Sequence, residues 1–251
     1  MEHNNCVLLT GTIDSGKFHN VGNRIIDINE RLDQYVNSIY SYIVDSAFNV
    51  IVFGENSGYA FDESVFVELA HKHGKEFEYV RCNSYVDETI KRGKSYGEAR
   101  LISEALQTSR LLANENTIYK CTGRIYLKNS HQICNTKNKH QNEFIVYQNK
   151  NWCFTNLFKF SKSDYQKYWI NAYEKCNERE GKDIERVFFD ILTSVKELDI
   201  GSFSVWPYFD GIQGATLEAY TGGMIERVLR TIMCKLGFFS YGTFTSKLMR
   251  F

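Results

Sequence analysis

Residues 93–127, GKSYGEARLISEALQTSRLLANENTIYKCTGRIYL, contain a helix pattern followed by a strand pattern. The strand pattern is interrupted at Gly123, which indicates a bend. One glycine-bearing turn carries Lys94 before the helix, and a second carries Arg124 within the strand. Two cationic turns separated by one helix are suited to binding a phosphorylated ligand, because each offers a charge and nearby backbone amides.

The same alternation of strand and helix precedes this segment. Apolar runs predict strands at 6–9, 49–53, 77–81 and 117–127, and helical spacing predicts helices at 23–44, 62–73 and 96–112. Such alternation is typical of an α/β domain whose largely parallel central sheet is flanked by helices.

Ligands of parallel sheets bind beyond the carboxyl ends of the strands. We therefore expect one crevice lined by segments 10–12, 54–58, 82–84 and 122–124. The chain beyond residue 129 is less regular. It predicts a polar loop at 130–142, a hairpin of strands 144–147 and 152–155, and helices at 163–176, 183–196 and 218–236, the last with a break at Gly222-Gly223.

Composition limits the classes of function. Among 251 residues, 30 basic and 30 acidic side chains cancel, so no overall field attracts the chain to nucleic acid. The seven cysteines form no CxxC pair, and the first residues lack a secretory pattern. No apolar stretch is long enough to span a bilayer. We expect a cytoplasmic protein, with attachment to the inner face of the cell membrane left open.

A near match to a phosphate loop lies at residues 11–17, GTIDSGK. Phe18 stands where the hydroxyl that binds Mg²⁺ is required. We interpret this segment as a loop over a nucleotide. A nucleotidyl- or phosphotransferase that uses Lys17 is the alternative.

Several polar residues at the predicted strand ends have two interpretations each. Glu55, followed by Asn56, would bind a base or ribose, or would cap amides of its own loop. Lys94, with Gly97 nearby, would bind a diphosphate or lie in a solvated turn. Arg124 lies among apolar residues and needs an anionic partner, either a substrate phosphate or a carboxylate such as Glu98.

Three carboxylates are candidates for a catalytic base. Asp183 and Glu185 begin a predicted helix, where they would also complement its dipole. Asp210 lies in a glycine-bearing loop, where it would also serve as a turn residue. The six histidines show no metal-binding spacing, so no metal ligand is assigned.

The segments VLLTGTI, VIVFGENSGY, GKSYGEARLI, YKCTGRIYL and FDGIQGATLEAY resemble those of GT-A-type sugar-nucleotide glycosyltransferases of bacterial surface-polysaccharide assembly. The resemblance implies a Rossmann-like GT-A fold. It also implies a hexosyltransferase that moves a sugar from a nucleotide diphosphate such as UDP to a hydroxyl of a lipid-linked glycan. The product would belong to O-antigen, lipopolysaccharide or capsule.

The resemblance also implies roles for particular residues. Main-chain contacts to the donor would come from Thr10, Gly11 and Thr12, with Glu55 near the base or ribose. The family's metal-binding DxD would fall where this chain has Thr122-Gly123-Arg124. Arg124 and Lys94 would then neutralise the diphosphate, and no cofactor is required, although Mg²⁺ or Mn²⁺ stays open. In an inverting enzyme Asp183 or Glu185 would be the base.

We divide the chain into a nucleotide-sugar-binding region (1–129), an acceptor-binding and catalytic region (130–234) and a basic aromatic tail (235–251). The tail carries Lys235, Lys247 and Arg250 without an acid, which suits contact with anionic lipid or docking on the core. The expected partners are a nucleotide-diphosphate sugar and a glycan or glycolipid acceptor. A non-catalytic nucleotide- or sugar-binding module is the second alternative.

Overall fold

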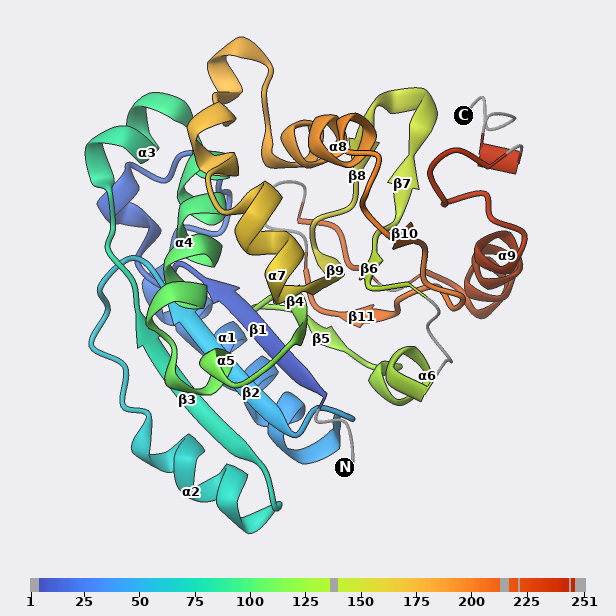
Figure 1. The fold of residues 1–251 in the computed structure, drawn as a ribbon. Helices are drawn as coiled ribbons and strands as arrows, with labels where there is room; N and C mark the ends of the chain where they lie inside the picture. The colour runs from blue at the N-terminus through green and yellow to red at the C-terminus, as the bar shows by residue number, and fades with distance from the viewer. Residues whose placement is uncertain (1–4, 136–139, 213–216, 221, 244, 247–251) are drawn as a thin grey trace.

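The central strand of the main sheet is β1 (Cys6–Gly11), which is parallel to β2 (Val50–Glu55) on one side and to β4 (Thr117–Thr122) on the other. β3 (Glu76–Arg81) continues the parallel order beyond β2. All residues of β1 and β2 are buried, because helices cover both faces of the sheet (Figure 1). The structure is a computed structural model that describes residues 5–135, 140–212, 217–220, 222–243 and 245–246.

Three strands complete the sheet beyond β4, in the order β10-β6-β9-β4-β1-β2-β3. β9 (Leu157–Ser161) is antiparallel to β4, β6 (Asn142–Glu143) is antiparallel to β9, and β10 (Ile200–Gly201) is parallel to β6. The predicted α/β class, with a mostly parallel central sheet flanked by helices, is confirmed. Because these three strands lie beyond residue 129, both sides of the predicted region boundary contribute to one sheet.

Two small antiparallel sheets lie beside the main one. β5 (Tyr126–Leu127) pairs with β11 (Phe209–Asp210), and β7 (Val146–Tyr147) pairs with β8 (Trp152–Cys153) as the predicted hairpin. The bend predicted at Gly123 separates β4 from β5, so the long strand pattern is divided between two sheets.

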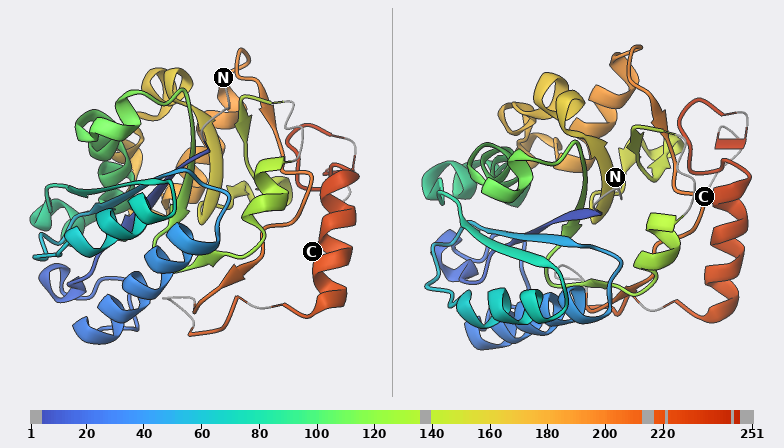
Figure 2. Two further views of the ribbon diagram at one scale, coloured as in Figure 1. Left: turned by 90° about the horizontal axis from the view of Figure 1, so that it is seen from below. Right: turned by 60° about the horizontal axis from the view of Figure 1, so that its bottom comes forward.

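Alternating side chains of each strand face two hydrophobic clusters. The helices are α1 (Ile28–Asp45), α2 (Ser64–Lys72), α3 (Val86–Arg92), α4 (Lys94–Thr108), α5 (Arg110–Ala113), α6 (Ser130–Asn135), α7 (Lys162–Asp164), α8 (Ile184–Ser194) and α9 (Met224–Lys235). α1 and α2 pack with Val7 and Leu9 on one face of the sheet, whereas α4 and α8 pack with Cys6 and Leu8 on the other. Figure 2 shows α9 at the outer side of the molecule, away from α1 and α2.

Two helix predictions and one loop prediction need correction. The helix predicted at 96–112 is two helices, because Ser109 is extended and its side chain caps the amide of Leu112. The polar segment 130–142 contains α6 and β6 around residues 136–139, which lie outside the described residues. The last predicted helix begins only at Met224, after the glycine pair.

The chain changes direction across the sheet between β1 and β4. It passes from β1 to β2 and β3 on one side, and then crosses to β4 on the other. At the carboxyl ends of these two strands, the amide of Gly123 donates to the carbonyl of Thr10 at 2.8 Å. A Cβ on Gly123 would lie 2.8 Å from that carbonyl oxygen, so the close approach requires glycine. Ligands of open α/β sheets bind at such a switch point.

Candidate functional site

A cavity of about 210 Å³ lies at the carboxyl ends of β1 and β4. Its wall includes many residues predicted from the sequence: Thr10, Gly11, Thr12, Asn56, Lys94, Gly97, Thr122, Arg124 and Glu185. Segments 10–12 and 122–124 therefore meet at one site, as expected for neighbouring parallel strands. Segment 82–84 does not line it, because Asn83 is bound to the carboxylate of Glu104. We call this space the switch-point cavity.

The loop after β1 is held by α1. Arg31 is buried and donates to the carbonyls of Thr12 and Ile13, both at 3.0 Å. The Tyr35 hydroxyl accepts from the amide of Thr12 at 2.8 Å. A Cβ on Gly11 would come within 2.8 Å of the Tyr35 ring. The backbone of this loop is therefore fixed before any ligand binds, and Arg31 adds a buried positive charge to the cavity wall.

Glu55 holds two loops of the protein together and does not face the cavity. It is fully buried, and its carboxylate accepts from the amides of Ile13, Ser57 and Gly58 at 2.9 Å each. These bonds join the loops that follow β1 and β2. The prediction that Glu55 reaches a base or ribose is wrong for this arrangement, because both oxygens are used inside the protein. Its neighbour Asn56 does line the switch-point cavity and accepts from the Thr12 hydroxyl at 2.7 Å.

The N-terminus of α4 is already bound to a carboxylate of the protein. Glu178 accepts from the Ser95 amide at 3.0 Å and from the Ser95 hydroxyl at 2.6 Å. The expectation that this turn offers free amides to a diphosphate is therefore wrong at Ser95. The Lys94 side chain remains exposed and lines the switch-point cavity.

Arg124 is half-buried, and its guanidinium donates to the side-chain oxygen of Gln34 at 2.8 Å. None of the ion pairs among the described residues includes Arg124 or Lys94. Glu98, the carboxylate considered as a partner for Arg124, is paired with Lys120 instead. Both cations thus face the cavity without a carboxylate partner. Gly123 does not line the switch-point cavity. Its amide is bound to the carbonyl of Thr10.

The pair between Lys120 and Glu98 was not predicted. Lys120 lies on β4, is fully buried, and also donates to the carbonyl of Thr155 at 2.8 Å. Glu98 lines the switch-point cavity. The sequence does contain a signal for this pair. Lys120 lies within the mostly apolar strand TIYKCT, and a charge buried in such a strand needs a partner, as was argued for Arg124.

Glu185 is the predicted base that lies in the cavity. It lies in the first turn of α8, and its carboxylate accepts from the Thr155 hydroxyl at 2.9 Å. Burial and then the negative charge of Glu98 raise the pKa of Glu185 to about 7. A carboxyl group with this pKa exchanges its proton readily at neutral pH, as general acid–base catalysis requires.

The other two predicted bases lie elsewhere. Asp183 caps α8, accepts from the amide of Arg186 at 2.8 Å and forms an ion pair with that side chain. Asp210 is exposed on β11 and pairs with Lys128 at 3.3 Å. Neither lines the switch-point cavity. Asp183 thus serves as a helix cap and Asp210 as an ion-pair partner on β11.

Residues 11–17 do not form a phosphate loop. Residues 15–18 make one 3₁₀ turn, and the next helix starts only at Ile28. The Lys17 amine donates to the carbonyl of Ser57 at 2.8 Å and is not part of the cavity wall. Across the described ranges, no group of three or more His, Cys, Asp or Glu side chains has a geometry suited to a metal ion.

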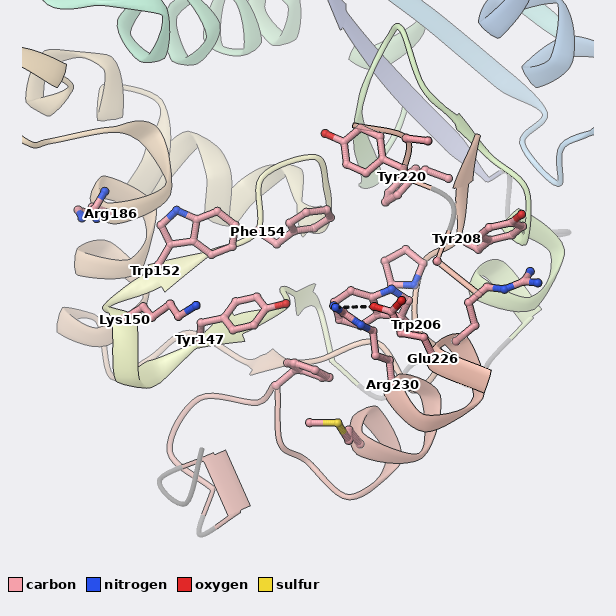
Figure 3. A pocket seen from close by; sticks show the side chains of 17 residues that line it. Tyr147, Lys150, Trp152, Phe154, Arg186, Trp206, Tyr208, Tyr220, Glu226 and Arg230 are labelled. Carbon is pink, nitrogen blue, oxygen red and sulfur yellow. Dashed lines mark ion pairs between the residues drawn. The ribbon is translucent and has the colours of Figure 1, made fainter. Parts of the chain in front are cut away.

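A second cavity, of about 950 Å³, lies between the β7–β8 hairpin and α9 (Figure 3). We call it the aromatic cavity. Tyr147, Trp152 and Phe154 form one side, and Trp206 and Tyr208 lie on the other. Tyr220 lines both cavities. No sequence pattern indicated this site, because its rings come from separate segments.

Scans against protein-family models and curated protein sequences give no match. Solved structures that resemble this chain include a cytidylyltransferase from Leptospira borgpetersenii (12% identity, 80% of this chain and 76% of that one, TM-score 0.42). A candidate nucleotide-diphospho-sugar transferase from Desulfovibrio desulfuricans has 10% identity over 79% and 78%, with a TM-score of 0.47. The galactosyltransferase LgtC, solved with donor and acceptor sugar analogues, has 6% identity over 78% and 72%, with a TM-score of 0.45. The function is therefore inferred from this chain's own residues.

Proposed function

We propose that this protein is a glycosyltransferase that moves a sugar from a nucleotide diphosphate to a hydroxyl group, with the donor diphosphate in the switch-point cavity. One observation carries the proposal. A single cavity at the switch point contains Lys94 and Arg124, which have no carboxylate partner among the described residues, together with Glu185, whose pKa is raised to about 7. Cations for a leaving diphosphate and a carboxyl group that titrates near neutrality are what sugar transfer to a hydroxyl needs.

The size of the cavity suggests which part of the donor it holds. About 210 Å³ is below the roughly 300–1,000 Å³ typical of sites for drug-sized ligands. The cavity therefore suits the diphosphate and the adjoining sugar, and the nucleoside would extend over the rim. Arg124 can bind two phosphate oxygens at once, whereas Lys94 supplies a mobile point charge.

Glu185 would act as the general base. As the acceptor oxygen forms its bond to the anomeric carbon, the bond from that carbon to the diphosphate oxygen breaks. The hydroxyl proton passes to Glu185, and the leaving diphosphate carries its negative charge to Arg124 and Lys94. The hydroxyl of Thr155 orients the carboxylate from 2.9 Å. The metal-binding carboxylates expected from the resemblance would fall at the end of β4, where this chain has Thr122-Gly123-Arg124. A cation stands there in place of carboxylates, so we derive no step through a metal.

The alternative of a nucleotidyl- or phosphotransferase using residues 11–17 has weaker support. It requires the Lys17 amine at a phosphate, but this amine is bound to the carbonyl of Ser57. A non-catalytic binding module is distinguished by experiment, since it would bind a nucleotide without turnover.

We further propose that the acceptor is a lipid-linked glycan of surface-polysaccharide synthesis and that α9 contacts the cytoplasmic face of the membrane. Six apolar side chains of α9 and the residue after it are between 47% and 76% exposed: Met224, Ile225, Val228, Leu229, Ile232 and Leu236. An exposed apolar row of this kind suits an interfacial helix. In the tail, Phe239 is buried against Trp206, and Lys247 and Arg250 lie outside the described residues, so we assign the lipid contact to α9. No helix of the described part is long and apolar enough to cross a bilayer.

Calorimetry with UDP, GDP and CMP, with and without Mn²⁺, tests donor binding. We expect one nucleoside diphosphate to bind, and Arg124→Gln to weaken its binding about 10- to 100-fold by removing a charged hydrogen bond of about 1.5–3 kcal/mol. The exposed Lys72→Gln on α2 is the matched charge control. If the wild type binds none of these nucleotides, or if Arg124→Gln binds equally well, the donor site is refuted.

Sedimentation with phosphatidylglycerol vesicles tests the membrane proposal. Ile225→Ser with Leu229→Ser should reduce the bound fraction several-fold, because two exposed apolar side chains would be lost from the α9 row. Val65→Ser, at a 63% exposed site on α2, is the control. Equal binding of the wild type and the double variant would exclude α9 as the contact.

A further inference from the structure

The aromatic cavity has two aromatic sides facing each other. Trp152 on the β8 side stands opposite Trp206 on the chain that leads to β11 (Figure 3), and the Phe154 ring packs against Trp206 with the ring centroids 6.4 Å apart. Flat ring faces pack well against the C–H faces of pyranose rings, and the Tyr147 hydroxyl, directed into the space, adds a polar group. Apolar rings with a few polar groups among them are typical of ligand sites.

The charged residues of this cavity are mostly cationic. Lys150, Arg186, Arg227 and Arg230 line it, whereas the only carboxylate among the described lining residues is Glu226. Arg230 pairs with Glu226 at 2.7 Å, and Arg186 pairs with Asp183 outside the lining. Two cations, Lys150 and Arg227, therefore remain without a carboxylate partner in the described part of the chain.

Arg227 is the better placed of the two. Its guanidinium carbon lies 4.0 Å from the centre of the Tyr208 ring, which fixes the plane of the group. Its Nε is buried and has no hydrogen-bond acceptor among the described residues. Because the ring sets the plane of the guanidinium, its terminal N–H groups are the ones that can bind the oxygens of an anion in the cavity.

The two cavities adjoin through consecutive residues. Phe154 lines the aromatic cavity and Thr155 the switch-point cavity, and the same holds for Arg186 and Glu185 on α8. Tyr220 belongs to both. A saccharide in the aromatic cavity can therefore extend a hydroxyl toward Glu185.

We infer that the aromatic cavity binds an acidic saccharide, one that bears a carboxylate or a phosphate, with Arg227 on the anion, Lys150 adding positive charge from the Tyr147 side, and the tryptophans on the sugar faces. That this saccharide is the acceptor rests on the proposed function. That the aromatic cavity binds it is independent of the proposed function. A neutral glycan would leave both cations without an anionic partner.

Tryptophan fluorescence measures this binding directly. Of the three tryptophans, Trp152 and Trp206 line the cavity, and Trp169 is fully buried in the core. The probes are cellobiose, cellobiouronic acid and phosphorylated cellobiose, which share one backbone. We expect the charged probes to change the fluorescence and to bind at least about 10-fold more tightly than cellobiose, as one charged hydrogen bond provides. Comparison of the two charged probes shows which anion is preferred.

Arg227→Gln and Lys150→Gln should each weaken binding of the charged probes several-fold and leave cellobiose binding unchanged. Lys150 is exposed, so its variant tests the site without risk to the fold, and Lys72→Gln is again the control. Equal affinity for all three probes, no binding of any saccharide, or a fluorescence response to UDP alone would overturn the inference. If charged probes bind but no nucleotide does, the donor proposal fails and the saccharide site stands.

Discussion

Glu98 and Glu185 line the same cavity from α4 and α8, and of the two only Glu98 has a cationic partner among the described residues, Lys120. Glu185 instead accepts a hydrogen bond from Thr155 and has its pKa raised to about 7. Two carboxylates whose environments differ in this way are suited to different roles. Glu98 is suited to a fixed charge, and Glu185 to proton transfer.

The pH dependence of activity should report Glu185. A general base works only when deprotonated, so kcat/KM should rise with pH through about 7 and level off above it. Glu98→Gln removes a charge that raises the pKa of Glu185, so the inflection should move to lower pH. Glu88→Gln, at an exposed site on α3, should leave it in place. Identical profiles for Glu98→Gln and wild type would show that the two carboxylates are not coupled.

Stability should depend on pH through the same residue. The folded-state pKa of Glu185, about 7, lies above its ordinary value of 4.5, so folding favours the protonated form. Its contribution to stability is full below about pH 4.5 and is lost as the pH rises through about 7. Glu185→Gln should therefore exceed wild type in unfolding free energy at pH 8 by on the order of 3 kcal/mol, and by less at pH 5.

Urea unfolding at the two pH values measures this difference. Glu143, whose pKa is also raised to about 7 by burial, is present in both proteins and cancels in the comparison. A Gln variant that is less stable than wild type at pH 8 would show that the charged form of Glu185 is not costly to the fold.

The buried pair of Lys120 and Glu98 should be costly to break from one side. Glu98→Gln leaves the fully buried Lys120 amine without its carboxylate, which we expect to cost about 3–5 kcal/mol. The double variant Glu98→Gln with Lys120→Met removes both charges and should be more stable than the single one. Urea unfolding compares the free energies of unfolding of the two variants. A double variant that is less stable than Glu98→Gln alone would refute the predicted cost of leaving Lys120 unpaired.

The parallel half of the fold was predictable because β1 and β2 are apolar runs that alternate with helical patterns. β9 was not predicted, since its LFKFS contains Lys159, whose buried partner Glu143 lies on β6 and is distant in sequence. The sequence predicts a loop where α6 forms, because the segment is polar. Ile133 is its one apolar side chain that is fully buried in the structure.

The candidate site was predictable where strand order alone decides position. Thr10 and Arg124 line one cavity because the ends of β1 and β4 are neighbours. Glu55 was misassigned because its amide partners come from a loop whose path the sequence does not specify. The aromatic cavity was missed for the same physical reason, since Trp152 and Trp206 meet only through tertiary packing.

The rate of sugar transfer by Glu185→Gln tests the central claim most directly. Product is measured by mass spectrometry with the nucleotide sugar whose nucleotide binds, and donor affinity is measured in parallel. We expect kcat to fall at least about 100-fold, the usual contribution of a general base, while the donor Kd stays within about threefold of wild type. Wild-type kcat in Glu185→Gln would contradict the assignment of Glu185 as the base in the switch-point cavity.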